Sequence, residues 1–232
     1  MDKVVLGFGW YIVFVFSLVL HEAAHAYAAK KGGDPTAYRG GQVTLNPIPH
    51  IARDRFGMVI IPILSFWMWG WMIGWASTPF DPFWAERYPR RSAAMALAGP
   101  AANLFLVICA VILIRIGTYA GIFVPPSSAG FTTVTVSELG GLWNAVSVIV
   151  SILFTLNLVL LIFNLMPIPP LDGSAALPLL IGEGNARSFW AFTRRPVFML
   201  VGLILVWRVF GYIFGPIFNA ALNIVYPGVS YG

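Results

Sequence analysis

Hydrophobic residues in this chain form long uninterrupted runs, without the alternation or the one-sided periodicity of a soluble strand or helix. Uncharged runs cover residues 4–20, 57–78, 92–114 and 143–171, and a last run, 196–226, contains only Arg208 as a charged residue. A run of about 18 or more uncharged residues is long enough for a helix to cross a bilayer. The pattern therefore predicts an all-α polytopic membrane protein, and the absence of internal repeats predicts a single domain over 1–232.

Shorter patterns predict the elements between these runs. The first helix is expected to continue through the alanine-rich "HEAAHAYAA", and the fourth run ends in a proline cluster that a short helix, Gly173 to Ile181, is expected to follow. Residues 36–46 contain Gly-Gly and the alternating "QVTL", which favour a short β-hairpin or edge strand.

Positive charge predicts which side each loop occupies. Lys and Arg gather in residues 30–55, 79–91 and 183–195, whereas 117–142 contains neither. Basic loops remain on the cytoplasmic side, but a single crossing by 57–78 would separate the first two groups. We therefore predict that 57–78 is re-entrant, with bends at Pro62, Gly70 or Gly74. The N-terminus and 117–142 are then outside.

Composition narrows the class further. Hydrophobic residues make up 59% of the chain and charged residues 10%, where soluble domains carry about 25% charged residues. The net charge of +5 follows from the basic loops. The sequence contains no basic run interleaved with aromatic residues, so nothing in it indicates a nucleic-acid partner. The expected environment is the lipid bilayer of the cell membrane. Cys109 is the single cysteine, so no intrachain disulfide can form.

The first candidate for chemistry is His21-Glu22-Ala23-Ala24-His25, which fits the pattern H-E-x-x-H. Residues four apart share a helix face, so both imidazoles can bind one Zn²⁺, and Glu22 can take a proton from a water that the metal activates. Chance or a packing role is the alternative. Ionisable groups inside an otherwise uncharged span are costly and usually functional, which favours the metal site. Seventeen residues before it rise about 25 Å, which places it within the membrane near the cytoplasmic face.

A catalytic zinc site needs a third protein ligand and one open position. The only other histidine is His50, and most carboxylates lie in polar segments. Asp172 instead follows twenty-nine uncharged residues, in "NLMPIPPLDGSAAL", whose prolines exclude a regular helix. The alternative is that Asp172 only caps the helix that follows; the two roles are compatible.

Two asparagines inside apolar runs are further candidates. Asn103 ends the small-residue stretch Gly99-Pro100-Ala101-Ala102-Asn103, and Asn164 lies eight residues before Asp172. Either amide could stabilise a developing oxyanion, and a helix-packing role is an equal alternative.

Taken together, these motifs resemble the site-2 protease family of intramembrane zinc metalloproteases. The similarity rests on "HEAAH", on Gly99 to Asn103 and on "NLMPIPPLDG", residues 164–173, in this order on three hydrophobic segments. It implies that His21, His25 and Asp172 bind one zinc ion, that Glu22 is the general base and acid, and that Asn103 and Asn164 assist the substrate or transition state. The implied catalytic core covers about 4–182.

The resemblance is closest to the compact subgroup without PDZ or CBS domains. That subgroup commonly has N-P-x-x-H-I-D after the first motif, whereas this chain has Ala52 at the acidic position and Asp54 nearby. His50 is accordingly an outer partner of the site, an alternative metal ligand or an ordinary loop histidine. The implied function is cleavage of a transmembrane protein or peptide substrate. A zinc-binding scaffold without cleavage activity and a metal transporter are the rival hypotheses.

Overall fold

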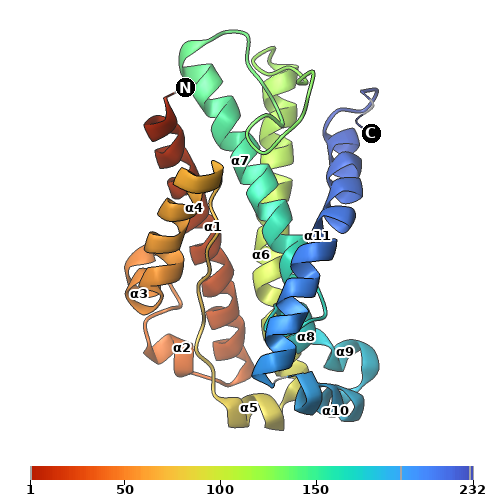
Figure 1. Ribbon diagram of the computed structural model, residues 1–232. Helices are drawn as coiled ribbons and strands as arrows, with labels where there is room; N and C mark the ends of the chain where they lie inside the picture. Colours follow the sequence, from red (N-terminus) through yellow and green to blue (C-terminus); the bar gives the residue numbers. More distant parts are fainter. Residues whose placement is uncertain (1, 194, 230, 232) are drawn as a thin grey trace.

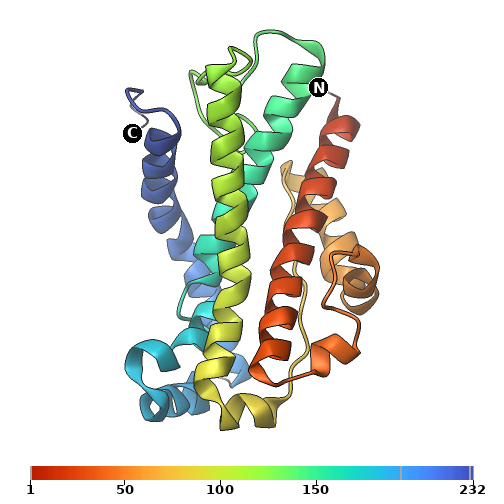
Figure 2. The ribbon, with the colours of Figure 1, turned by 180° about the vertical axis from the view of Figure 1, so that it is seen from behind.

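The protein is described by a computed structural model that covers residues 2–193, 195–229 and 231. Within this part of the chain, four helices are long and apolar enough to cross a membrane: α1 (Lys3–Gly32), α6 (Pro89–Tyr119), α7 (Gly141–Asn164) and α11 (Pro196–Val225). They run along the length of the molecule (Figures 1 and 2). The prediction of an all-α polytopic membrane protein is confirmed.

The remaining helices are short, and several lie at the end of the bundle where α1 finishes (Figure 1). They are α2 (Thr36–Arg39), α3 (Pro47–Arg53), the π-helix η1 (Phe56–Ile60), α4 (Ile61–Trp69), α5 (Pro82–Arg87), α8 (Asp172–Ala176), α9 (Pro178–Ile181) and α10 (Glu183–Thr193). Helix α7 ends at Asn164, so 165–171 is non-helical, and α11 continues through Arg208 without a break. Arg194, part of the third basic group, lies outside the described residues.

Helix α6 packs against both α1 and α7, and α7 crosses behind it at an angle (Figure 2). Small buried side chains make the contact close, since Ala26 and Ala29 of α1 and Ala93 of α6 are fully buried. In an apolar solvent, helices associate through such close packing and through interhelical hydrogen bonds. Helix α11 packs only loosely, since only 6% of its most apolar 18-residue stretch is buried within the protein.

Residues 54–78 run out along α4 and return in extended form (Figure 1). The turn is at Gly70, whose φ of 80° is readily adopted only by glycine. On the way back, the Trp75 N–H donates to the Gly57 carbonyl, and the Ser77 N–H and hydroxyl both donate to Asp54. The two ends of the segment are therefore neighbours, as a re-entrant segment requires. That it enters the membrane and returns to the same side stays a prediction.

Cysteine labelling tests this topology. In a Cys109→Ala background, Arg55→Cys and Glu86→Cys place single thiols at exposed positions on either side of the segment. We expect an impermeant maleimide to label both from the cytoplasmic side and neither from the outside. Labelling of the two from opposite sides would show that 57–78 crosses the membrane once.

The β-hairpin predicted for 36–46 is wrong. Residues 36–39 form α2, and no strand occurs in 40–46. The backbone N–H groups of Gly40, Gly41 and Gln42 donate back to carbonyls of α2, which ends any pairing there. No backbone hydrogen bond joins 43–45 to another described segment. The alternating pattern is present, but a strand also needs a partner strand for its backbone hydrogen bonds, and no described segment supplies those bonds to 43–45.

Asp34 ties the end of α1 to the start of α5. Its carboxylate accepts hydrogen bonds from the N–H and hydroxyl of Thr36 and from the N–H of Asp81. Burial by itself would raise the pKa of Asp34, but these hydrogen bonds outweigh it and hold the pKa below the usual value. This contact anchors the segment that returns past the glutamate of the H-E-x-x-H motif.

Candidate active site

The tertiary structure brings Asp172 to the two histidines of α1. One ligand atom from each of His21, His25 and Asp172 lies within 4.8 Å of the others. The two Nε2 atoms are 3.0 Å apart, and Oδ2 of Asp172 is 3.2 Å from Nε2 of His21 and 3.3 Å from that of His25. The predicted ligand set therefore converges on one point.

Local structure explains this convergence. His21 and His25 are one turn apart on α1, and both are buried. Asp172 is the first residue of α8, directly after the proline-rich segment 165–171. Gly173 lies so close to the carbonyls of Leu165 and Met166 that a Cβ would overlap them. The sharp return of the chain to the site thus depends on the glycine that follows the aspartate.

Hydrogen bonds to the far nitrogens set the state of both imidazoles. Nδ1 of His21 is 2.6 Å from Oδ1 of Asn103, and Nδ1 of His25 is 2.8 Å from the Met95 carbonyl. Both oxygens can only accept, so each Nδ1 carries the hydrogen and each Nε2 keeps its lone pair. Two lone pairs and a carboxylate then face one another at close range.

This donor set fits zinc. Two imidazole nitrogens and one carboxylate oxygen leave the fourth tetrahedral position open, as in catalytic zinc sites. Oδ2 of Asp172 is buried and lacks a hydrogen bond of proper geometry within the described residues, although both histidines are near it. A cation would satisfy that oxygen and both lone pairs at once.

Gly99 of α6 forms the wall behind the two histidines. A Cβ built on Gly99 would overlap Nε2 of both His21 and His25. Any larger residue at position 99 would therefore occupy the point at which the ligands meet. The small-residue stretch serves this site directly, as well as the packing of α6 against α1.

Glu22 is 5% exposed and is held by a residue that the sequence patterns did not single out. The Thr78 hydroxyl lies 2.7 Å from Oε2 of Glu22 and 2.9 Å from its carbonyl oxygen. Thr78 ends the extended segment that returns past α1. No motif signals this residue, because its role depends on where that segment passes α1.

Removing the Thr78 hydroxyl should slow the reaction without removing the metal. A hydrogen bond to a charged group contributes about 1.5–3 kcal/mol, so Thr78→Val should lower kcat about 10- to 100-fold at unchanged zinc content. Peptide cleavage and metal analysis on the same preparation measure both. Thr118→Val is the matched control, since the Thr118 hydroxyl donates to a carbonyl of its own helix. Equal activity of both variants would contradict the role of Thr78.

The other predicted residues occupy different positions. Asn103 is fully buried, and both ends of its amide are bonded, to His21 and to Asn157. These contacts favour a positioning role over oxyanion donation. Asn164 donates to the Leu160 carbonyl of its own helix, and His50 donates to the Thr44 carbonyl. His50 is not in the ligand cluster.

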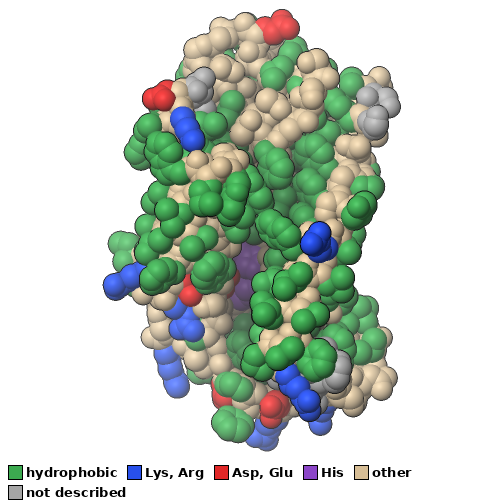
Figure 3. All heavy atoms as spheres, in the orientation of Figure 1, with side chains coloured by type: hydrophobic (Ala, Val, Ile, Leu, Met, Phe, Trp, Pro, Cys, Tyr) green, Lys and Arg blue, Asp and Glu red, His purple; other side chains and the backbone are tan. Residues whose placement is uncertain are grey.

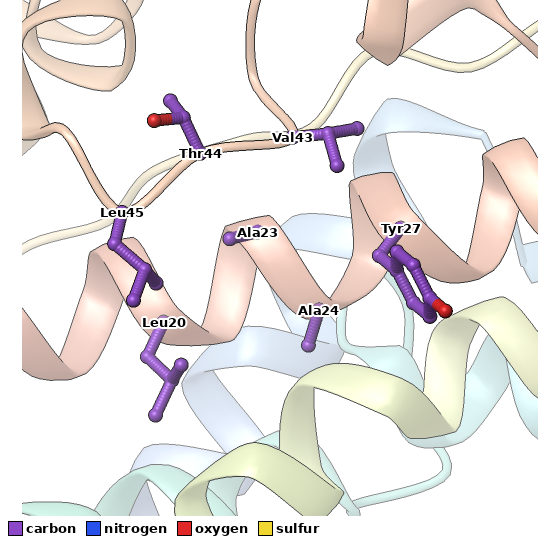
Figure 4. A pocket seen from close by; sticks show the side chains of 7 residues that line it. All are labelled: Leu20, Ala23, Ala24, Tyr27, Val43, Thr44 and Leu45. Atoms are coloured by element: carbon purple, nitrogen blue, oxygen red, sulfur yellow. The ribbon is translucent and has the colours of Figure 1, made fainter.

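Two surface features lie beside this cluster. Figure 3 shows histidine side chains at the base of a hollow between α11 and the α1 side of the molecule. A separate groove of about 300 Å³ runs between α1 and the loop residues 43–45 (Figure 4). It is lined by Leu20, Ala23, Ala24, Tyr27, Val43, Thr44 and Leu45, and its α1 residues interleave with the H-E-x-x-H motif.

An H-E-x-x-H helix with a carboxylate beside its two histidines, enclosed by apolar helices, is the arrangement expected of a membrane metalloprotease. The sequence model of Peptidase family M50 matches residues 9–209. The chain belongs to this family, the site-2 proteases, and is a multi-pass membrane protein.

Curated relatives agree. The chain is 31% identical over 210 residues to "Putative zinc metalloprotease YwhC" of Bacillus subtilis, covering 90% of this chain and 85% of that one. It is 28% identical over 198 residues to "Putative zinc metalloprotease Rip2" of Mycolicibacterium smegmatis, covering 85% and 65%. With the Rip2 protein of Mycobacterium tuberculosis it is 28% identical over 212 residues, covering 90% and 70%. No solved structure matches the chain.

Proposed function

We propose that this protein is an intramembrane zinc endopeptidase that hydrolyses a peptide bond within or near the transmembrane segment of a membrane-protein substrate. One observation carries the proposal: His21, His25 and Asp172 converge beside Glu22, buried among helices that are otherwise apolar. A soluble substrate that cannot enter the membrane would not reach such a site. A peptide bond that already lies within the membrane would.

The residues divide the chemistry between them. His21, His25 and Asp172 would hold one zinc ion per chain, which when bound acts as a Lewis acid and makes water a nucleophile near neutral pH. Glu22 takes the proton from the attacking water and delivers it to the leaving amine. Thr78 holds the Glu22 carboxylate in place for both transfers. Asn164 remains a candidate donor to the substrate, once it releases the Leu160 carbonyl.

The groove of Figure 4 suits an extended substrate segment. Residues 43–45 form no backbone–backbone hydrogen bond with another described segment, and their one carbonyl with a side-chain partner, that of Thr44, accepts from His50. Their remaining N–H and C=O groups can pair with a peptide laid beside them (Figure 4). The opposite wall is the face of α1 that carries Leu20, Ala23, Ala24 and Tyr27. A substrate helix that unwinds there would expose its backbone to hydrolysis.

Charge supports an opening toward the cytoplasm. Lys30 and Lys31 end α1, while Arg90 and Arg91 begin α6 at the same end of the bundle. Figure 3 shows most of the visible Lys and Arg side chains in that half of the molecule. By the positive-inside tendency, this end faces the cytoplasm of the cell membrane. His21 and His25 of the ligand cluster lie in the half of α1 nearer this end.

The proposal is tested on the purified, detergent-solubilised wild-type protein. We expect about one zinc per chain and cleavage of a co-reconstituted transmembrane peptide, with loss of cleavage on chelation and recovery when zinc is restored. Zinc at one per chain without cleavage across many transmembrane substrates would instead identify a zinc-binding scaffold. A protein that takes up no zinc would contradict the metal site itself.

A further inference from the structure

A chain of amide groups connects the zinc-ligand candidate His21 to the backbone of α7. Asn103 accepts from His21 through Oδ1 and donates through Nδ2 to Oδ1 of Asn157, at 2.9 Å. Nδ2 of Asn157 donates at 2.8 Å to the Leu153 carbonyl and at 2.9 Å to the Ser17 hydroxyl oxygen. Ser17, Asn103 and Asn157 are all fully buried, so water cannot substitute for any of these partners.

Only one group in this series of hydrogen bonds has a fixed role as donor or acceptor. The Leu153 carbonyl can accept and never donate, whereas a hydroxyl can do either and an amide can rotate by 180°. Because Asn157 must turn its NH₂ group toward Leu153, its oxygen faces Asn103. Asn103 must then turn its own NH₂ group toward Asn157, and its oxygen faces His21. The hydrogen on His21 is thereby placed on Nδ1.

We propose that Asn157 is a positioning residue that fixes the tautomer of His21 through Asn103, so that Nε2 of His21 stays free to bind the metal. The inference rests on the proposed zinc site, although not on proteolysis. If Asn103 were rotated, its NH₂ group would face Nδ1, the hydrogen would move to Nε2, and that hydrogen would point at the metal. Asn157 touches neither the metal ligands nor the groove that we assign to the substrate.

Substitution of Ser17 tests whether the Leu153 carbonyl, and not the Ser17 hydroxyl, orients the Asn157 amide. Its hydroxyl accepts from Asn157 but cannot dictate the direction of the amide. Ser17→Ala leaves the bond to Leu153 intact, so its zinc affinity should remain within about twofold of wild type. Asn157→Leu removes the acceptor, Oδ1 of Asn157, that holds Asn103 in one orientation. Since loss of an outer partner of a metal ligand costs about 10–100-fold in affinity, a weakening of this size is expected.

The experiment measures zinc affinity by chelator competition, and in zinc-loaded, ¹⁵N-histidine-labelled protein it identifies the protonated and metal-bound nitrogens of His21. Wild type should show a protonated Nδ1, and Asn157→Leu a mixture with weaker zinc binding. Thr155→Val is the matched control, since Thr155 is also fully buried on α7 and its hydroxyl has no hydrogen-bond partner among the described residues. Asn157→Leu with wild-type affinity and a single tautomer would overturn the inference.

A rescue separates positioning from a general loss of packing. Asp at position 103 has two acceptor oxygens, so rotation cannot present a donor to His21. Asn103→Asp combined with Asn157→Leu should therefore regain the protonated Nδ1 and zinc affinity within about threefold of wild type. Persistent weak binding with two tautomers in the double variant would overturn the inference.

Asn157→Asp replaces the leucine variant if that one does not fold. Its carboxyl still accepts from Nδ2 of Asn103, so a single His21 tautomer is expected, and a mixture would contradict the proposal. A wild type that takes up no zinc would overturn the metal site and this inference together. A wild type that binds zinc and cuts no peptide would overturn only the proposed activity.

Discussion

Glu22→Gln should abolish peptide cleavage and leave the zinc content at the wild-type level. The substituted amide has the shape of the carboxylate but cannot take a proton from water at neutral pH. General acid–base catalysis contributes about 10²–10⁴-fold, so kcat should fall by at least about 100-fold. Cleavage of a transmembrane peptide and metal analysis, carried out on one preparation, measure the two quantities together.

The control for this variant is Glu86→Gln, which makes the same chemical change at an exposed residue of α5. Its activity and metal content should match the wild type. Glu22 is not one of the three residues that we assign to zinc, so the metal should stay. Cleavage at an undiminished rate by Glu22→Gln would remove Glu22 from the mechanism, and another base would have to be found.

Gly99→Ala should eliminate zinc binding although every ligand is still present. The added methyl group would overlap Nε2 of both His21 and His25, so both imidazoles must leave the positions from which they converge with Asp172. Loss of a single outer partner costs up to about 100-fold in metal affinity, and displacement of two ligands should cost more. Overpacking of this kind also destabilises a fold by about 1–3 kcal/mol.

Gly211→Ala is the matched control, because a Cβ at this position of α11 has nothing within 4 Å. The same methyl group should there leave zinc binding unchanged and alter stability by about 1 kcal/mol or less. Chelator competition for the metal and thermal unfolding followed by circular dichroism compare the two variants. A Gly99→Ala protein with wild-type zinc affinity would show that α6 moves aside easily and does not form a rigid wall.

Much of this architecture follows from local sequence. Hydropathy locates the four long helices, because in a bilayer every backbone polar group must be satisfied within its own segment or a closed partner structure. It marks residues 57–78 as well, and only the charge of the flanking loops argues against a single crossing there. The convergence of His21 and His25 is equally local, since 3.6 residues per turn bring positions four apart together. Asp172 could be selected as the third ligand because it follows a long uncharged stretch and lies among prolines, where a carboxylate is costly unless it has a function.

What local sequence did not supply concerns partners distant in sequence. "QVTL" has the alternation of a strand, yet whether a second strand lies beside it is decided by the rest of the fold. The sequence left Asn103 open between oxyanion stabilisation and helix packing, and the structure shows its amide bonded to both His21 and Asn157. Thr78 reaches Glu22 only because the segment after α4 returns along α1.

The sequence by itself thus determined the membrane class, the long helices and the candidates for zinc binding. Only the tertiary structure decided that atoms of these candidates converge, and which amides and hydroxyls hold them. The physical reason is that a helix sets its own internal spacing, whereas contacts between helices depend on their relative rotation and translation. Those are set by packing over the whole bundle, which no single segment encodes.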